Sequence, residues 1–420
     1  MTCLCVRQAE IKDYRMPEKT CILAYSGGLD TSVLIKWLQE HYGVEVIATV
    51  FDVGQDKTED LGVIEKKALT IGAYGAQTLD LRQEFAEHYI APAIKANGLY
   101  ENKYPLVSAL SRPLMVKHLV DQAHARGAAY IAHGCTGKGN DQVRFDVACA
   151  ALDPSLQVLA PVREWDLLTR ADEIAYAEEH GIPIPVTQAR PYSVDDNLFG
   201  RTIECGILED PWVTPPEDIY GLTNDPAGPE APNTPQEITL SFEAGLPVAL
   251  DGVAMDLLPL IGALTEIGSL HGCGRIDMIE NRLVGLKSHE IYEVPAAVAL
   301  LTAHKALEDI CLDRDVAHYK LDLEHKWAEL VYYGLWFSPL KTALDSFIET
   351  TQQYVSGEVR LRFFKGSISV TGRRSPWALY DYKLATYDEG DSFNRDAAKG
   401  FIEIHGLPLR TWASLHPSGF

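Results

Sequence analysis

The sequence lacks the features of a secreted, membrane-spanning or nucleic-acid-binding protein. Its 37 basic residues are outnumbered by 59 acidic ones, so the formal net charge is −22. This charge repels phosphate backbones and anionic membrane surfaces unless a local basic cleft overrides it. The N-terminus has no apolar run long enough for a secretory signal, and prolines and aspartates interrupt the densest apolar stretch, residues 246–264. We expect a cytoplasmic protein whose main partner is neither nucleic acid nor a membrane.

Cysteine is too scattered to indicate a disulfide framework or a zinc site. The eight cysteines form no C-x-x-C pair, so we expect reduced thiols. The tripeptide "HGC" occurs twice, at His133–Cys135 and at His271–Cys273, and could supply four soft metal ligands. Because the two copies lie far apart in unrelated contexts, we expect no protein metal site and assign Cys135 and Cys273 to packing.

Two common nucleotide-binding motifs are missing. No G-x-x-x-x-G-K-[ST] occurs; residues 134–139, "GCTGKG", come nearest, with Ala132 where the first glycine should be. No G-x-G-x-x-G follows a strand-like run, which disfavours a dinucleotide site.

Regular alternation of strand-like and helix-like segments begins near residue 20. We predict strands over residues 21–25, 44–54, 76–81, 129–134 and 156–162, and helices over 31–43, 58–73 and 111–128. This order is typical of an α/β fold whose parallel sheet has helices on both faces.

The pattern changes in the second half of the chain. Seven prolines within residues 211–236 predict an extended connection. Residues 237–250 and 359–372 are typical of antiparallel hairpins, the latter turning at Lys365–Gly366, and 296–311 of a helix. We predict an extension (1–19), an α/β domain (20–188), an α+β domain (189–385) and a C-terminal tail (386–420).

The stretch Ser26-Gly27-Gly28, between a predicted strand and a predicted helix, has the features of a phosphate site. Glycines let backbone N–H groups approach phosphate oxygens, and the helix presents its positive end. Hydroxyl groups of Ser26, Thr31 and Ser32 add donors. Asp30 would repel phosphate unless Mg²⁺ or a substrate cation lies between them. A plain tight turn is the alternative interpretation.

A second loop, "HGCTGKGNDQVRF" at residues 133–145, combines glycine, donors and both charges, which suits small polar substrates. Arg144 can hold a carboxylate with two N–H groups, and Asp141 can take an ammonium. Lys138 suits phosphate, although a solvent-facing lysine is the ordinary alternative.

These segments carry a family resemblance. "SGGLDTS" resembles the pyrophosphate loop of the N-type ATP pyrophosphatases, and "AYSGGLDTS" resembles that of the argininosuccinate synthases. Residues 133–145, 180–198, 231–238 and 274–296 are similar to the same family, and the likeness extends from residue 20 to past 380.

The resemblance implies an adenine-nucleotide α-hydrolase-like domain followed by a synthetase domain. It implies a ligase of arginine biosynthesis that joins citrulline and aspartate through a citrulline adenylate, with MgATP as substrate and AMP and pyrophosphate as products. It also implies a homotetramer in which residues 386–420 form an arm.

Site residues follow from the same resemblance. It implies ATP-binding roles for Ala24, Tyr25, Ser26, Gly27, Gly28, Leu29, Asp30, Thr31, Ser32, Phe51 and Gly134. It implies citrulline-binding roles for Tyr104, Ala109, Asn140, Arg144, Ser193, Thr202, Glu280 and Tyr292. It implies aspartate-binding roles for Thr136, Asn140 and Asp141. Asp30 and Lys138 are the predicted catalytic residues, and no residue stands out as a general base.

Some positions depart from the family pattern. Ala109 stands where some relatives carry a substrate-contacting serine, so that contact is absent or is made by Ser108. Thr202 replaces a serine, and His289 replaces a common arginine and receives no role. The first 16 residues have no counterpart in short members of the family, and Met16 would be a natural start.

Two other functions stay open from the residues themselves. A tRNA-thiolating member of the superfamily would need a basic RNA surface and a placed catalytic cysteine, which the charge of −22 disfavours. An inactive nucleotide- or metabolite-binding homologue is disfavoured by the intact "SGGLDTS" and by Asn140, Asp141 and Arg144.

Overall fold

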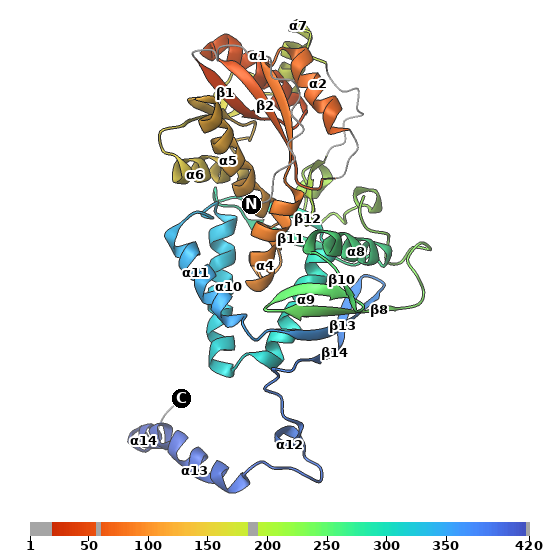
Figure 1. Cartoon of the computed structure of the whole chain (residues 1–420), viewed down its shortest axis with the longest axis vertical. Coiled ribbons are helices and arrows are strands. Elements are labelled where there is room, and N and C mark those ends of the chain that lie inside the picture. Colours follow the sequence, from red (N-terminus) through yellow and green to blue (C-terminus); the bar gives the residue numbers. More distant parts are fainter. Residues whose placement is uncertain (1–18, 56–59, 184–191, 417–420) are drawn as a thin grey trace.

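The chain forms an N-terminal domain, a larger C-terminal domain and a C-terminal arm, arranged along one long axis (Figure 1). The computed structural model describes residues 19–55, 60–183 and 192–416. The predicted domain boundary at 188–189 and nearly all of the predicted extension 1–19 lie outside these residues.

The N-terminal domain is built on a parallel sheet of five strands in the order β3-β2-β1-β4-β5. Its strands are β1 (Thr20–Ala24), β2 (Glu45–Asp52), β3 (Gly75–Asp80), β4 (Tyr130–Ala132) and β5 (Gln157–Leu159). These are the five strands that the alternation predicts, and the parallel sheet is confirmed. Because parallel strands end at one edge, the segments after β1, β2 and β4 meet there.

Helices cover both faces of this sheet. Cys21 and Leu23 of β1 pack with α1 (Leu29–Tyr42), α2 (Leu61–Ile71) and α7 (Arg170–Glu179). Ile22 points the other way and belongs to the core formed by α5 (Val107–Arg126) and α6 (Asp141–Leu152). Alternate side chains of one strand thus serve two cores, as expected of a sheet buried on both faces.

Two antiparallel sheets form the frame of the C-terminal domain. The first has the order β10-β9-β8-β13-β14 and the second the order β11-β12-β7-β6. The first contains β8 (Gln236–Glu243), β9 (Leu246–Leu250), β10 (Val253–Ala254), β13 (Gly357–Phe364) and β14 (Ser367–Arg374). The second contains β6 (Ser193–Asn197), β7 (Gly200–Glu204), β11 (Arg275–Asn281) and β12 (Lys287–Glu293).

Both predicted hairpins are confirmed in the first sheet. The later one turns at Lys365 and Gly366, whose φ angles of 47° and 81° are those of a tight turn that matches the strand twist. The proline-rich connection is irregular apart from the short 3₁₀ turn at Glu217–Ile219.

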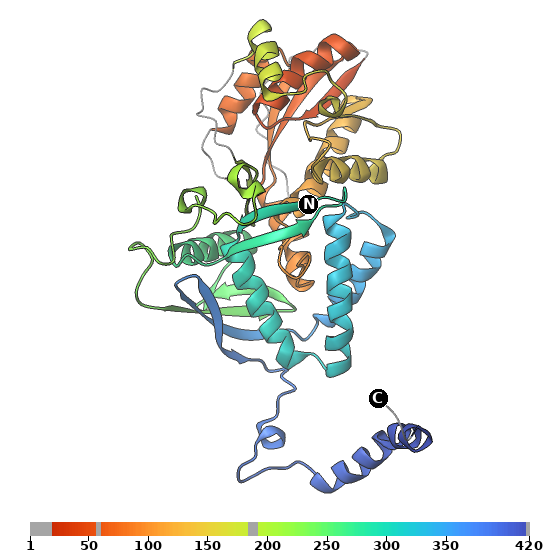
Figure 2. The same ribbon diagram turned by 180° about the vertical axis from the view of Figure 1, so that it is seen from behind.

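Long helices complete the C-terminal domain, and those of residues 314–351 reach toward the N-terminal one (Figure 2). They are α8 (Leu257–Leu270), α9 (Pro295–Cys311), α10 (Arg314–Tyr332) and α11 (Pro339–Thr351). Between the domains run α3 (Arg82–Phe85), a π-helical turn (Ala86–Ile90) and α4 (Ala91–Lys95), which joins the same core as α5 and α9. This continuous core connects the two domains.

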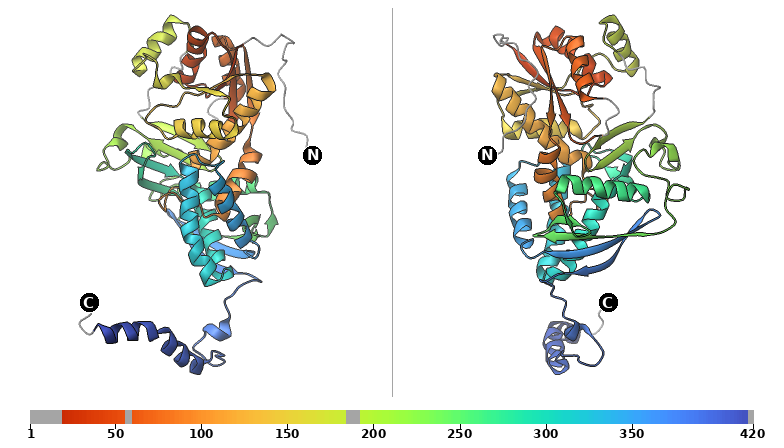
Figure 3. Two further views of the ribbon diagram at one scale, coloured as in Figure 1. Left: turned by 90° about the vertical axis from the view of Figure 1, so that its left-hand side faces the viewer. Right: turned by 45° about the vertical axis from the view of Figure 1, so that its right-hand side comes forward.

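The predicted tail is helical and projects from the body (Figure 3). It contains α13 (Arg395–His405) and α14 (Leu407–Leu415), and the short helix α12 (Tyr382–Ala385) precedes it. Large apolar side chains along it stay in solvent: Tyr387 is 98% exposed and Ile404 74%. No described helix combines the length and apolarity that crossing a bilayer requires.

Candidate active site

The turn between β1 and α1 is a compact glycine loop held from both sides. Gly27 has a φ of 80°, and a Cβ there would lie 2.9 Å from Ile64. The Ser26 hydroxyl lies 3.0 Å from that of Thr31 and accepts the Gly28 amide at 3.3 Å. On the α2 side, Lys67 donates to the Gly27 carbonyl at 2.6 Å. The loop therefore turns sharply and keeps its hydroxyl groups at the start of α1.

A cavity of about 580 Å³, the first cavity, opens at this loop on the carboxyl edge of the sheet. Its wall includes Phe51 at the end of β2, Gly134 after β4, and Val194 of β6 in the C-terminal domain. A Cβ on Gly134 would approach Thr31 to 3.0 Å, so a glycine brings the loop after β4 close to α1. An apolar wall beside a polar glycine loop suits a flat apolar group joined to phosphates.

A second cavity of about 400 Å³ adjoins the first and lies between the two domains. It is lined by Asn140, Asp141 and Arg144, around the start of α6, and by Thr202, Glu280 and Tyr292 from the C-terminal sheet. Six residues line both cavities: Ser26, Arg112, Gly134, Cys135, Asp141 and Asp195.

The shared wall contains an ion-pair cluster that spans the two domains. The Nη2 atom of Arg112, on α5, lies 2.7 Å from Asp141 and 2.5 Å from Asp195 of β6. Arg144 pairs with the other oxygen of Asp141 at 2.8 Å. Burial by itself would raise the pKa of Asp141, but the charges of Arg112 and Arg144 outweigh it and hold that pKa well below its usual range.

Two tyrosine hydroxyls hold the carboxylate of Glu280 at the far side of the second cavity. Tyr292 and Tyr332 donate to its two oxygens, each at 2.6 Å. Tyr104 stacks on Tyr292 at 4.5 Å between ring centroids and accepts the Ser108 amide at 2.9 Å. The position of Glu280 is therefore set by aromatic side chains that are themselves buried.

Asn140 fixes the loop before α6 to the C-terminal domain. Its amide donates to the Tyr332 hydroxyl at 2.7 Å and accepts the Leu283 backbone N–H at 2.9 Å. Both the nitrogen and the oxygen of its side-chain amide are thus engaged, so Asn140 serves as a contact between the domains.

Within the part of the chain that the structure describes, two buried polar atoms in the wall of the second cavity have no hydrogen-bond partner: Nη2 of Arg144 and Oγ1 of Thr202. The remaining Arg144 nitrogens are engaged, Nε with the Tyr332 carbonyl at 3.0 Å and Nη1 with Asp141. Arg144 therefore offers one nitrogen to a ligand, whereas the sequence predicts that it holds a carboxylate with two N–H groups. Unpaired buried polar groups are rare in native proteins, so these atoms indicate where a polar ligand binds.

The second cavity contains more carboxyl groups than guanidinium groups. Asp141, Asp195, Glu204, Glu280 and Glu290 face Arg112, Arg144 and Arg282. Burial, followed by the charges of Glu204 and Glu280, raises the pKa of Glu290 from its ordinary value of 4.5 to about 8. Such a wall favours ligands that carry ammonium groups.

Most of the predicted site residues line these cavities. The predicted ATP residues in the first cavity are Ala24, Tyr25, Ser26, Gly27, Gly28, Thr31, Phe51 and Gly134. The predicted citrulline and aspartate residues in the second cavity are Tyr104, Thr136, Asn140, Asp141, Arg144, Ser193, Thr202, Glu280 and Tyr292.

Other predicted residues line neither cavity: Leu29, Asp30, Ser32, Ala109 and Lys138. Ala109 is buried, whereas the neighbouring Ser108 lines the second cavity and donates to Asp195 at 2.5 Å. Lys138 is exposed. Asp30 faces α7. The pKa of Glu173 on that helix is raised to about 8, first by the burial of Glu173 and then by the hydrogen bond and charge of Asp30. The catalytic roles of Asp30 and Lys138 remain predictions.

The two "HGC" segments do not form a metal centre. Among the described residues no cluster of three or more histidine, cysteine or acidic side chains could hold a metal ion. The Cys135 amide donates to Nδ1 of His133, whose Nε2–H therefore donates to Asp146. Cys135 lines both cavities, but burial raises the pKa of its thiol, which disfavours a reactive thiolate.

Sequence reasoning missed several residues of the cavity walls, namely Arg112, Asp195, Glu204, Arg282 and Glu290. "SRP" at residues 111–113 and "DD" at 195–196 carry no signal by themselves. Only the contact between α5 and β6 gives them a shared position.

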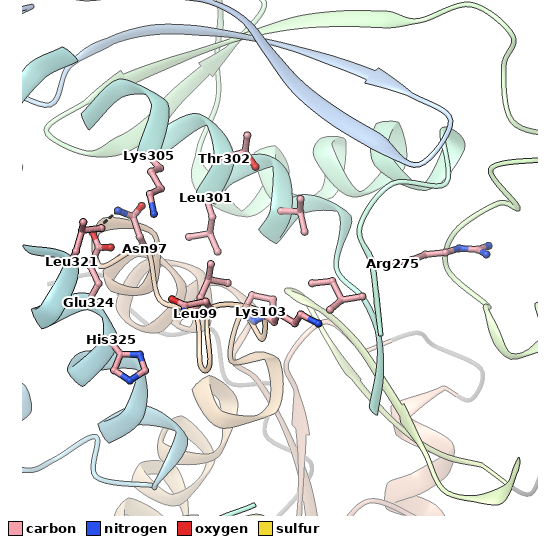
Figure 4. A pocket seen from close by; sticks show the side chains of 14 residues that line it. Asn97, Leu99, Lys103, Arg275, Leu301, Thr302, Lys305, Leu321, Glu324 and His325 are labelled. Carbon is pink, nitrogen blue, oxygen red and sulfur yellow. Dashed lines mark hydrogen bonds between the residues drawn. The ribbon is translucent and has the colours of Figure 1, made fainter. Parts of the chain in front are cut away.

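A third cavity, of about 450 Å³, lies between helices of the C-terminal domain and the segment 97–105 that follows α4, and contains none of the predicted site residues (Figure 4). Leu99 and Leu301 line its centre, and Asn97 and Glu324 one end. The Asn97 amide donates to Glu324 and to Glu308, each at 2.6 Å, so this end belongs to a buried polar network.

Two family models match the chain. Residues 20–183 match the model described as "Arginosuccinate synthase N-terminal HUP domain", and residues 192–412 match "Arginosuccinate synthase C-terminal domain".

Curated relatives with the name argininosuccinate synthase are similar over nearly the whole chain. The protein from Symbiobacterium thermophilum is 55% identical over 403 residues, which is 96% of this chain and 100% of the relative. Those from Oceanobacillus iheyensis and Bacillus pumilus are 54% and 56% identical and cover 96% and 93% of this chain and 96% of each relative.

Solved structures give a weaker likeness. A 4-thiouridine synthetase in complex with RNA and ATP is 18% identical, with a TM-score of 0.29 over 39% of this chain and 41% of that chain. The U34-tRNA thiolase NcsA from Methanococcus maripaludis is 14% identical, with a TM-score of 0.25 over 41% of this chain and 61% of that chain.

Proposed function

Because the chain belongs to the argininosuccinate synthase family and joins citrulline to aspartate at the expense of ATP, we propose that its two adjoining cavities divide this reaction between them. The first cavity binds MgATP and the second binds the two amino acids. The residues that line both cavities lie where the substrates react. The shared wall is the single observation that carries this division.

ATP binds with its adenosine against the apolar wall around Phe51 and its phosphates at the glycine loop. The hydroxyls of Ser26 and Thr31 and the N-terminal end of α1 favour the phosphate charge. Mg²⁺ arrives with ATP as part of the substrate, and hydroxyl and phosphate oxygens are ligands that it accepts. Its charge offsets that of the phosphates.

Citrulline binds in the second cavity with its polar groups on the two unpaired atoms. Arg144 Nη2 donates to an oxygen of citrulline, and the Thr202 hydroxyl makes a further hydrogen bond. Glu280, held by two tyrosines, takes the ammonium group. Aspartate binds beside it, near Thr136 and Asp141.

The reaction then proceeds in two steps. The ureido oxygen of citrulline attacks the α-phosphorus in line, the bond to the bridging oxygen breaks, and pyrophosphate leaves with its electron pair. The aspartate nitrogen next attacks the ureido carbon, AMP leaves with the former ureido oxygen, and the amine loses a proton. Both steps depend mainly on positioning and on stabilisation of charge.

The path of one oxygen atom tests this sequence of steps. With ¹⁸O placed in the ureido group, mass spectrometry should find the label in AMP. Label in inorganic phosphate, together with ADP, would show instead that citrulline is phosphorylated from the γ-phosphate.

Substrate dependence tests the division into cavities. Pyrophosphate should be released from ATP when citrulline and aspartate are both present, and Arg144→Lys should weaken citrulline binding while ATP binding barely changes. Release that requires tRNA would support the thiolating alternative, and no release under any condition would support the inactive one.

We also propose that the enzyme is a cytoplasmic homotetramer held by its arm. The arm projects from the body (Figures 1 and 3), and its large apolar side chains are exposed, Tyr387 at 98% and Ile404 at 74%. Neighbouring copies would remove these side chains from water, which is the usual reason for such an exposed surface.

A further inference from the structure

We propose that Arg112 stabilises the charge that develops on the α-phosphoryl group when citrulline attacks it, a role that the sequence predicts for Lys138. The proposal rests on the function described above. It adds a residue that the family resemblance does not assign.

The position of Arg112 carries the argument. The ureido oxygen must come from the second cavity and the α-phosphoryl group from the first, so they meet where the cavities share a wall. Among the described residues of that wall, Arg112 is the only cation. Arg144 and Arg282 line only the second cavity, and Lys138 lines neither.

The environment of Arg112 keeps its charge at this place. Its side chain is 12% exposed, and it bonds to Asp141, Asp195 and the Ser111 hydroxyl. Three of the five N–H groups of this guanidinium donate hydrogen bonds: Nε–H to Asp141, one on Nη2 to Asp195 and one on Nη1 to Ser111. Nη2 also lies 2.7 Å from Asp141 in an ion pair. One N–H of Nη1 is left to donate to a phosphate oxygen.

The local charges balance before any substrate binds. Arg112 and Arg144 oppose Asp141 and Asp195, so the cluster is formally neutral. As the ureido oxygen adds to the α-phosphorus and the bond to pyrophosphate breaks, negative charge grows on the α-phosphoryl and leaving oxygens. A fixed, partly buried guanidinium stabilises that charge more strongly than water would.

Asp195 positions Arg112 from the other domain. It lies on β6, accepts from Arg112 Nη2 at 2.5 Å and also from the Ser108 hydroxyl at 2.5 Å. Since Arg112 lies on α5 of the N-terminal domain, this ion pair forms only when β6 is docked on that helix. The charge is therefore aligned by the contact that closes the second cavity.

The test isolates the first chemical step. Citrulline-dependent exchange of labelled pyrophosphate into ATP, measured without aspartate, reports the adenylation, and MgATP binding is measured separately without citrulline. We expect Arg112→Gln to slow the exchange by about 10²–10³-fold. Its dissociation constant for MgATP should change by less than about threefold, because the missing charge acts in the transition state. Arg112→Lys keeps the charge and should lose less.

A second variant and a matched control keep the test decisive. Asp195→Asn should slow the exchange less than Arg112→Gln, and the double variant should be no slower than Arg112→Gln alone, because both act through one guanidinium. Arg373→Gln removes a similar arginine, paired with Asp309 at 2.8 Å in the C-terminal domain, and should exchange at the wild-type rate.

Three results would overturn the proposal. These are exchange by Arg112→Gln at the wild-type rate, a MgATP dissociation constant that rises by the factor by which exchange falls, and a lysine variant as slow as the glutamine variant. Failure of the proposed function would look different, because wild-type protein would then show no citrulline-dependent exchange.

Discussion

At the scale of single residues, two threonine hydroxyls in the C-terminal domain have opposite surroundings. Thr202 Oγ1 is buried without a partner in the wall of the second cavity. Thr223 Oγ1 donates to Glu293 at 2.7 Å and accepts from Arg275 at 2.8 Å. A buried hydroxyl without a partner costs free energy unless a ligand supplies one.

We predict that Thr202→Val raises the Michaelis constant for citrulline by about 2–10-fold, which corresponds to one hydrogen bond of about 0.5–1.5 kcal/mol. The free energy of unfolding should not fall, because no bond within the protein is lost. Thr223→Val is the matched control and should lower that free energy by about 1–3 kcal/mol with the citrulline constant unchanged. Steady-state kinetics and urea unfolding measure both; an unchanged citrulline constant in Thr202→Val would contradict the assignment.

The buried carboxyl group of Glu290 should make the stability of the fold depend on pH. Burial, then the charges of Glu204 and Glu280, raise its folded-state pKa from 4.5 to about 8. The folded state therefore holds this proton more tightly than the unfolded state, so stability is fully present below pH 4.5 and is lost as the pH rises toward 8.

We expect Glu290→Gln to remove part of this pH dependence. Relative to wild type, the variant should gain a few kcal/mol or less of unfolding free energy between about pH 5 and pH 8. Denaturant unfolding at several pH values measures the difference. A constant difference across this range would show that Glu290 does not titrate there.

At the scale of elements, the glycines on either side of α1 allow two causes of strain to be separated, a left-handed backbone and a steric clash. Gly27 and Gly43 both have positive φ, 80° and 61°. A Cβ on Gly27 would meet Ile64 at 2.9 Å, whereas one on Gly43 would meet nothing within 4 Å. Gly27 also lines the first cavity.

We predict that Gly43→Ala costs about 1–2 kcal/mol of stability, the usual cost of a left-handed backbone, and leaves ATP binding unchanged. Gly27→Ala should cost at least as much and should also weaken MgATP binding, because the loop must shift away from Ile64. Equilibrium binding and unfolding of the two variants give the comparison. Equal effects on MgATP affinity would mean that strain in α1, and not the loop, controls binding.

The elements that were predicted correctly are those with local signals. Hairpin β13–β14 has its turn residues beside it in the sequence, and α1 ends at Gly43, whose left-handed conformation terminates a helix. The helix α13 was missed although Asn394 is an N-cap that accepts the Ala397 amide at 3.1 Å. That signal was available in the sequence.

At the scale of the whole molecule, the arm is the part whose shape its own chain does not explain. Its helices α13 and α14 contain no buried residue. Short helices with exposed large apolar side chains are marginal in water, so we expect neighbouring copies to cover them.

If the proposed tetramer forms through the arm, deletion of residues 386–420 should shift it to smaller species. Citrulline-dependent pyrophosphate exchange should survive, because both cavities lie in the body. Light scattering gives the mass, and the exchange assay is the control for folding. An unchanged tetramer would remove the arm from the assembly.

Short stretches of sequence determined the glycine loop before α1 and the positions of the strands along the chain. Ser26, Gly27 and Gly28 act within one turn of chain, and each strand of the parallel sheet carries its own run of apolar residues. These features depend on backbone conformation and on neighbours along the chain, so the sequence alone contains them.

Only the tertiary structure decided which side chains pair with one another around the second cavity. Arg112 meets Asp195 across 83 positions, and Asn140 meets Tyr332 across 192. Such pairs form because packing of α5, β6 and α10 brings their side chains together, and no local pattern encodes which arginine will face which carboxylate. The same packing leaves Arg144 with one unpaired nitrogen and removes Lys138 from the cavities, since the contacts of a charged side chain depend on whatever the fold places around it.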